Sequence, residues 1–145
     1  MPFTGLQKVA ADPLNRIQPV PYYAEQSSPL AVLTTLSAVP GLSITLSTVT
    51  AGATYHAIGF LDWDNLDANT SSGLGILNID GASQTKQIRY AGTAATDKAT
   101  MGQQWFGTLA SAGSHTFTMQ AQADAASDLT VFSHSTLVVV IYEVV

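Results

Sequence analysis

With 145 residues, of which 46% are hydrophobic and only 10% charged, the chain is long enough for one domain and too apolar to be disordered. Its net charge is −5 and it has no cysteine, which excludes disulfides and thiolate metal sites. No apolar run reaches the about 18 residues of a membrane-spanning helix, and the first 16 residues lack the apolar stretch of a secretory signal. A nucleic acid or an anionic membrane is not an expected partner, because the five basic residues do not cluster: Lys8, Arg16, Lys86, Arg89 and Lys98.

Residues 1–29 differ in composition from the rest of the chain, because five of the six prolines fall there. Proline removes a backbone donor and favours extended geometry in the preceding residue, so no regular helix is expected. We interpret this segment as an extended N-terminal arm that lies on a neighbouring protein, with packing on its own domain as the alternative. Apolar side chains suited to anchoring recur along it: Phe3, Leu6, Val9, Leu14, Ile17, Val20, Tyr22 and Tyr23.

Residues 30–145 are expected to form one β domain, because apolar and polar residues alternate in many short segments. In 41–48, leucine and isoleucine alternate with serine and threonine, which predicts a strand with one buried face. Segment 53–63 is apolar at both sets of alternating positions, which is typical of a strand covered on both sides.

A hairpin is predicted over 74–92, where Asp80 and Gly81 supply the residues of a tight turn. Residues 93–102 are predicted to be a loop or a single helical turn. About eight short strands with turn residues between them predict an all-β, antiparallel sandwich of jelly-roll topology. The remaining strands of this sandwich are predicted at 103–109, 114–123 and 129–144.

His115 is the histidine with the most informative surroundings. It heads an apolar row with Phe117 and Met119, whereas Ser114 falls on the opposite face of the same strand. A catalytic histidine needs a nucleophile within hydrogen-bond reach and a carboxylate to orient it. We therefore predict a structural role at the rim of the core, with one ring nitrogen bonded to a backbone carbonyl.

Segment 62–73 is the most acidic stretch, since it contains Asp62, Asp64 and Asp67. Clustered carboxylates suit Ca²⁺, which prefers several oxygen ligands. The EF-hand template fails here, because Leu66 stands at its fifth position and an aspartate at its sixth. A solvated loop is the preferred interpretation.

Other chemistry-bearing residues show no motif. His56 and His134 fall in predicted strands without the close spacing of a metal site. Asp80 and Asp97 are acids that a glycosidase pair would require, but no pattern nominates them. No catalytic residue, metal ligand or cofactor is assigned, and enzyme activity is not expected.

Residues 30–145 resemble the small jelly-roll modules of tailed-bacteriophage virions, which are similar to trimeric TNF/C1q-like folds. The arm 1–29 lies outside the resemblance. The stretches that carry it are VPGLSITL (39–46), LNIDG (77–81), SAGSHTFTMQAQ (111–122) and STLVVVIYEV (135–144).

This resemblance implies a homotrimeric structural protein of the virion, made in the host cytoplasm and located on the capsid exterior. We expect a capsid decoration (cement) protein that binds the major capsid protein through its arm and its trimer base. The alternative is a receptor-binding module or a head- or tail-fibre tip that recognises a host glycan or protein. A small β-sandwich hydrolase is a third, minor hypothesis. The expected arm anchors are Phe3, Leu6, Val9, Leu14, Ile17, Tyr22 and Tyr23.

Overall fold

A computed structural model describes residues 19–66, 70–124 and 129–143. Within these residues all regular structure is β, and no helix long and apolar enough to cross a membrane is present. The strands are β1 (Val20–Glu25), β2 (Leu30–Ala31), β3 (Ser37–Thr48), β4 (Thr54–Asn65), β5 (Ser71–Ile79), β6 (Ala82–Gly92), β7 (Lys98–Thr108), β8 (Gly113–Ala123) and β9 (Leu129–Tyr142).

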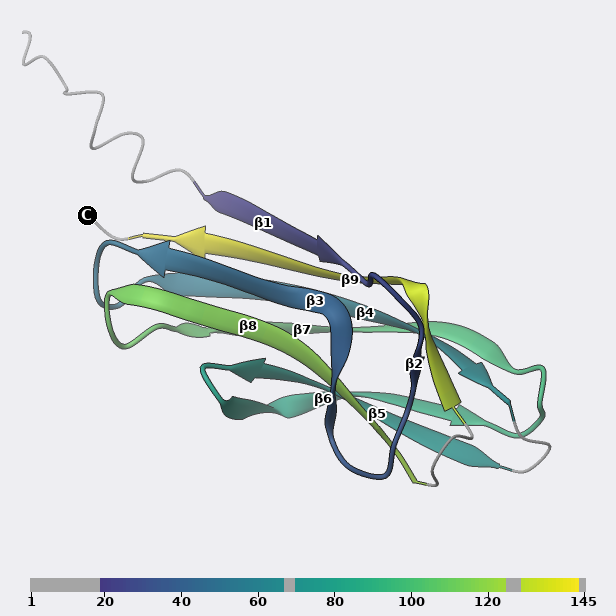
Figure 1. Ribbon diagram of the computed structural model, residues 1–145. Coiled ribbons are helices and arrows are strands. Elements are labelled where there is room, and N and C mark those ends of the chain that lie inside the picture. The colour runs from purple at the N-terminus through teal and green to yellow at the C-terminus, as the bar shows by residue number, and fades with distance from the viewer. Residues whose placement is uncertain (1–18, 67–69, 125–128, 144–145) are drawn as a thin grey trace, which may run out of the picture.

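The strands form two antiparallel sheets packed as a sandwich (Figure 1). The first, which we call the β9 sheet, has the order β1-β9-β4-β7, and the short β2 also pairs with β9. The second, the β8 sheet, has the order β3-β8-β5-β6. Strand pairs are nested along the chain, since β5 pairs with β6, β4 with β7, β3 with β8 and β1 with β9. This is jelly-roll topology, equivalent to one long hairpin rolled into two layers.

The predicted all-β sandwich with about eight strands is confirmed, and the two-residue β2 is the additional strand. The predicted hairpin is confirmed as β5 and β6. Its turn residues Asp80 and Gly81 have φ angles of 52° and 87°. Positive φ at both positions is what a two-residue turn between twisted antiparallel strands requires.

Strand β7 begins earlier than expected. The prediction of a loop or a helical turn is wrong for residues 98–102, which pair with Phe60–Asp64 of β4. Lys98 also forms an ion pair with Asp64, with 2.7 Å between Nζ and Oδ2. The stretch KATMG has little β-branched character, so pairing with β4 outweighs its local propensity.

The described part of the predicted arm is not separate from the domain. Residues 20–25 form β1, which pairs with β9 from Val20 opposite Ile141 to Glu25 opposite Thr136. Pro21 is compatible with this position because an edge strand has one unpaired side. The sandwich therefore begins at residue 20 rather than at residue 30, and residues 1–18 lie outside the described part.

Inward-facing residues of both sheets form one continuous core. Trp63, Phe117 and Met119 are fully buried in it. Trp63 stacks on Tyr90 with 5.7 Å between ring centroids, and Phe117 meets Tyr55 edge to face at 5.3 Å. Burying one such side chain contributes about 1.5–3 kcal/mol, so this core is the main source of stability.

Two glycines of β5 make room for large core side chains. A Cβ on Gly73 would lie 2.6 Å from Cζ3 of Trp63, and a Cβ on Gly75 would lie 2.5 Å from Cδ1 of Leu61. Contacts this short do not occur in folded proteins without a shift of the neighbours. The GLG sequence is therefore a packing feature of the sandwich.

We expect Gly73→Ala to lower the free energy of unfolding by about 1–3 kcal/mol, because the added methyl group overpacks the site beside Trp63. Urea unfolding measures this change. The matched control is Ser72→Ala on the exposed face of the same strand, which should shift stability by no more than about 0.5 kcal/mol. Equal effects of the two substitutions would contradict the packing assigned to Gly73.

Candidate functional site

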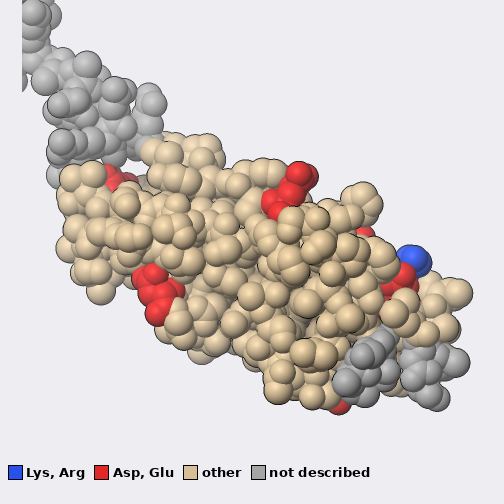
Figure 2. All heavy atoms as spheres, viewed as in Figure 1, with Lys and Arg blue, Asp and Glu red and all other residues tan. Residues whose placement is uncertain are grey.

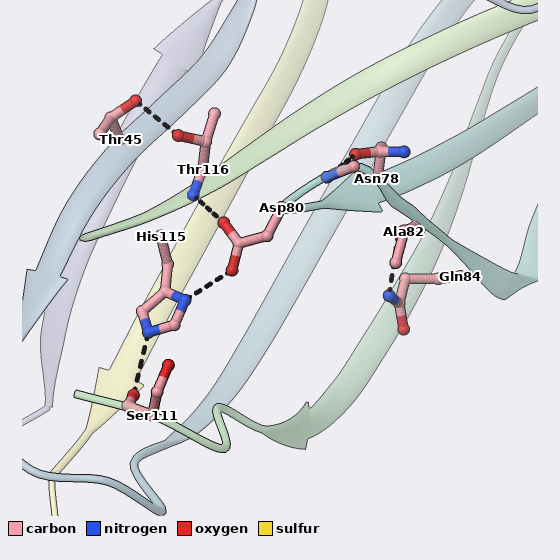
Figure 3. A network of polar contacts seen from close by, with 9 residues as sticks. Thr45, Asn78, Asp80, Ala82, Gln84, Ser111, His115 and Thr116 are labelled. Carbon is pink, nitrogen blue, oxygen red and sulfur yellow. Dashed lines mark hydrogen bonds and ion pairs between the residues drawn. The ribbon is translucent and has the colours of Figure 1, made fainter. Parts of the chain in front are cut away.

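His115 of β8 forms hydrogen bonds through both ring nitrogens (Figure 3). Its Nδ1 lies 2.6 Å from Oδ2 of Asp80 in the β5–β6 turn, and its Nε2 lies 3.1 Å from the carbonyl oxygen of Ser111. The second carboxylate oxygen of Asp80 accepts a 2.7 Å hydrogen bond from the amide of Thr116. The predicted bond to a backbone carbonyl is confirmed, and the carboxylate partner is a finding of the structure.

The partners of the ring favour its protonated form. A carbonyl oxygen and a carboxylate both accept, so an imidazolium, in which both nitrogens of His115 donate, satisfies both of them. The hydrogen bond to Asp80 is the main cause that raises the pKa of His115 above 6.5; burial opposes it and the Ser111 carbonyl adds to it. Burial alone would raise the pKa of Asp80, but hydrogen bonds from His115 and from the Thr116 amide outweigh burial and lower it below 3.8.

This pair holds two of the three groups of a nucleophile–base–carboxylate triad. The position of the nucleophile is taken by the Ser111 carbonyl oxygen, while Ser114 lies on the exposed face of β8, opposite Ser47 of β3. In its protonated form His115 has no ring nitrogen left to accept a proton. What the arrangement does is tie the β5–β6 turn to the start of β8 and to the segment before it.

The other two histidines lie in β4 and β9, in strands as predicted. His56 stacks on Phe106 of β7 with 4.2 Å between ring centroids, and its Nε2 lies 3.2 Å from Oε1 of Gln104. His134 is exposed on β9. In the part of the chain that the structure describes, no group of three or more His, Asp or Glu side chains is placed to hold a metal ion.

The acidic stretch is tied into strand pairing. Asp64 pairs with Lys98, and Asp62 accepts a 3.1 Å hydrogen bond from Oγ1 of Thr100 on β7. Asp67, the third acid of the candidate calcium loop, lies outside the described residues.

Asp80 and Asp97 are kept apart by β6. They lie in the turns at its two ends, and its 11 residues separate them by roughly 30 Å at strand rise. A glycosidase pair needs carboxyl groups about 5–9.5 Å apart. Oδ2 of Asp97 instead accepts hydrogen bonds from the amides of Thr93 and Ala94, which lower the pKa of Asp97 and hold the turn.

The outer face of the β8 sheet is polar and uncharged along β3 and β8. Ser43 and Thr118 form a hydroxyl pair across the two strands at 3.0 Å, as do Thr45 and Thr116 at 3.0 Å. Figure 2, in which β3 and β8 lie toward the viewer, shows only a few scattered charged side chains. A row of hydroxyl and amide groups of this kind is compatible with water.

The outer face of the β9 sheet is different, and we call it the apolar face. It contains four of the nine large hydrophobic side chains exposed among the described residues: Tyr23, Phe60, Phe106 and Tyr142. The apolar face ends at Phe60, because the outer side of β4 continues to Asp62 and Asp64, opposite Thr100 and Lys98 of β7. Strand register places fifteen residues on the apolar face, and Glu25 is the only one that is an acid, lysine or arginine. They are Pro21, Tyr23 and Glu25; Thr136, Val138, Val140 and Tyr142; Thr54, His56, Ile58 and Phe60; and Gly102, Gln104, Phe106 and Thr108.

This face explains why segment 53–63 is apolar on both sides. The inner positions of β4 are buried in the core, but Phe60 on the outer side is 43% exposed and Ile58 is half-buried. The sequence predicts that both sides of β4 are covered. The β8 sheet covers the inner side, whereas no described residue covers the outer side at Phe60.

A hollow lies in each of the two outer faces. The hollow in the apolar face has a volume of about 470 Å³ and lies between Phe60 and Phe106, with Lys86 at its border. The hollow in the β8 sheet has a volume of about 510 Å³, and its lining includes Leu74, Gln87, Arg89, Gln122 and Asp124.

The two tyrosines of the expected arm anchors separate onto the two sides of β1. Tyr22 packs against the core, whereas Tyr23 is 59% exposed on the apolar face. The other five expected anchors lie outside the described residues, so their role stays a prediction: Phe3, Leu6, Val9, Leu14 and Ile17.

Sequence reasoning did not single out Glu25, Lys86 or Phe106. The signal that points to Phe106 is its alternation with the buried Trp105 in β7, which leaves a phenylalanine on the outer side. Nothing local in the sequence brings Lys86 of β6 to the border of that face, because β6 belongs to the other sheet.

The search against protein-family models found no match, and neither did the search among curated proteins. Similar solved structures include the VP2 subviral particle of infectious bursal disease virus, with a TM-score of 0.55 and 12% identity, and the T13 particle of that virus, with 0.54 and 13%. Latent dimeric PorU from Porphyromonas gingivalis matches with a TM-score of 0.52 and 9% identity.

These matches cover 86% of this chain, which spans only 33%, 31% and 13% of the three matched chains respectively. At such identities the likeness shows the fold alone. Proteins of a viral particle are among those that share it, as is a bacterial protein of a different kind, so function has to come from surfaces and sites.

Stability should depend on pH through the pair of Asp80 and His115. Folding raises the pKa of His115, so its contribution is complete below pH 6.5 and is lost as the pH rises through the raised value. Folding lowers the pKa of Asp80, so its contribution is present above pH 3.8 and is lost as the pH falls through the lowered value. The pair therefore stabilises most between pH 3.8 and 6.5.

Asp80→Asn tests this, because asparagine tolerates the positive φ of the turn but carries no charge. We expect a loss of about 1 kcal/mol near pH 6, since the carboxylate is partly screened by water. The decline of wild-type stability above pH 6.5 should flatten in the variant. Urea unfolding over a pH series measures both effects, and a variant profile that coincides with the wild-type profile would contradict the pair's role.

Proposed function

We propose that the protein is a structural component of a virion, namely a bacteriophage capsid decoration (cement) protein that acts as a homotrimer. The observation that supports this most strongly is the apolar face, whose fifteen residues include one charged group, Glu25, and which borders Lys86 and the charged end of β4 and β7 with Asp62, Asp64 and Lys98. Extended apolar surface of this kind marks association sites on soluble proteins. The jelly-roll fold, which occurs in capsid proteins, is compatible with such a role.

In this role the protein works mechanically. Residues 1–18 precede β1 in the sequence and carry five apolar anchors along a proline-containing stretch. We propose that these anchors bind the major capsid protein on the capsid exterior. Three arms on one trimer bind more tightly than one through avidity, and the bridged capsid subunits then resist expansion under the pressure of packaged DNA.

No catalytic role is proposed. The Asp80–His115 pair faces a backbone carbonyl where a triad needs its nucleophile, and Asp80 and Asp97 lie at opposite ends of β6. Chemistry at either place would require a different arrangement from the one described.

A receptor-binding module or fibre tip is the second candidate, and the hollow in the β8 sheet favours it. Gln87, Arg89 and Gln122 present planar polar groups there, and Arg89 Nη2 donates to Gln87 Oε1 at 3.0 Å. Such groups suit the hydroxyls of a glycan. The volume of about 510 Å³ falls in the usual range of ligand sites.

Replacing the five arm anchors by serine in the full-length chain should weaken binding to capsid shells at least about tenfold, since burial of even one such side chain is worth about 1.5–3 kcal/mol. Co-sedimentation with shells lacking the protein measures this. The residues changed are Phe3, Leu6, Val9, Leu14 and Ile17.

The matched control replaces three polar residues of the same segment, Thr4, Gln7 and Asn15, by alanine, and it should leave shell binding unchanged. Both variants retain β1, so neither removes a strand from the sandwich. Unchanged binding after loss of all five anchors would contradict the role of the arm.

For the second candidate, the double substitution Arg89→Ala and Gln122→Ala should abolish any binding seen on a glycan array. The control is Lys98→Ala, which lies away from the hollow. A wild-type protein that binds no glycan, or glycan binding that survives the double substitution, contradicts a sugar site in this hollow.

A further inference from the structure

The apolar face has two unlike ends. At the β1 edge, Tyr23 stands 59% exposed, and its hydroxyl donates a 2.6 Å hydrogen bond to Oε1 of Glu25, two residues further along the strand. These two side chains form what we call the ridge. A carboxylate held by a tyrosine at the border of an apolar surface is a directional hydrogen-bond acceptor.

At the β7 edge the same face carries the hollow between Phe60 and Phe106, which are 43% and 62% exposed. Gly102 makes the hollow possible, because a Cβ there would lie 2.5 Å from the Phe60 ring. Lys86 borders it, with Nζ 6.0 Å from the centre of the Phe106 ring. The hollow thus combines two aromatic walls with one cation.

The ridge carries a carboxylate and the hollow borders a lysine, and these two opposite charges do not pair within one chain. Lys86 has no carboxylate within 4.0 Å among the described residues. Ridge and hollow share two rows of the register, those of Tyr23–Val138–Ile58–Gln104 and Glu25–Thr136–Phe60–Gly102. Three strand spacings separate the two edges, about 14 Å, so Glu25 and Lys86 of the same chain are too far apart to pair.

We propose that the ridge of one copy of this chain docks into the hollow of a second copy, with Tyr23 against Phe60 and Phe106 and Glu25 paired to Lys86. The proposal rests on the self-association in the proposed function and names its contact surface. Contact between two unlike patches lets each copy offer one patch and accept the other, and such a contact closes as a ring, such as a trimer, where the rotation between copies permits it and gives an open filament where it does not. Val138 and Ile58 lie half-buried between the two ends.

The contact explains several features of the chain at once. It supplies the second cover that the two-sided apolar sequence of β4 calls for. It places an aromatic ring against two others, which favours edge-to-face or offset packing. It also places Glu25 opposite Lys86, which borders the hollow, and such pairs select one docking register over others.

Charge exchange in the full-length chain tests the contact. Glu25→Lys and Lys86→Glu each put like charges together, so each should raise the dissociation constant of the assembly at least about tenfold. The double variant restores opposite charges and should restore assembly. Sedimentation velocity over a concentration series measures the mass and the dissociation constant, and thermal unfolding checks that each variant is folded.

The matched control is Arg89→Glu, a charge reversal on the outer face of the other sheet, which should leave the mass unchanged. A wild-type protein that is monomeric throughout the series overturns the contact, as do single variants that assemble like wild type. A double variant no better than the single ones also overturns it. If the wild-type protein is monomeric but binds capsid shells, this contact is wrong and the decoration role remains supported. If the single variants lose assembly and the double variant regains it, but the protein does not bind shells, the contact is supported and the decoration role is contradicted.

Discussion

Every strand of this molecule has two faces, and a two-layer sandwich covers only one of them. Alternate residues from both sheets meet in a core that includes Trp63, Phe117 and Met119. The other face of each sheet is left to water or to a partner. Along β3 and β8 of the β8 sheet that face is built of hydroxyl and amide groups, which water satisfies. On the β9 sheet it is built of aromatic and β-branched side chains, and this difference between the two outer faces underlies the proposed function.

The nested strand pairs give the β5–β6 turn a central place. Asp80 and Gly81 close the innermost pair, and β4 with β7, β3 with β8 and β1 with β9 follow outward. The carboxylate of Asp80 then reaches β8 through the His115 ring and the Thr116 amide. Asp80 therefore shapes the turn through its backbone and binds the turn to β8, the strand that pairs with β5, through its side chain. The Asp80–His115 pair, which suggests catalysis, instead connects the β5–β6 turn to β8.

Alternation was enough to predict the sandwich, the hairpin and the place of His115 at the core rim. It was not enough for contacts between residues distant in sequence, such as Asp80 with His115, or Lys86 with the face formed by β4 and β7. Lys98–Gly102 lacked a local strand pattern because pairing with β4 imposes its conformation. The two-sided apolar pattern of β4 was visible in the sequence, but only the structure separated the side that the core covers from the side that remains open.

The central claim is a structural role in the virion, so it is tested by the location of the protein rather than by an enzymatic assay. A decoration protein covers the capsid lattice in a fixed ratio to the major capsid protein, whereas a receptor-binding tip occupies a tail or a vertex. The most direct measurement is electron cryomicroscopy of the intact particle, combined with quantification of this chain against the major capsid protein. The account predicts density for this jelly roll across the outer shell, with the apolar face covered. Density confined to a tail or vertex, or a particle without the chain, would contradict it.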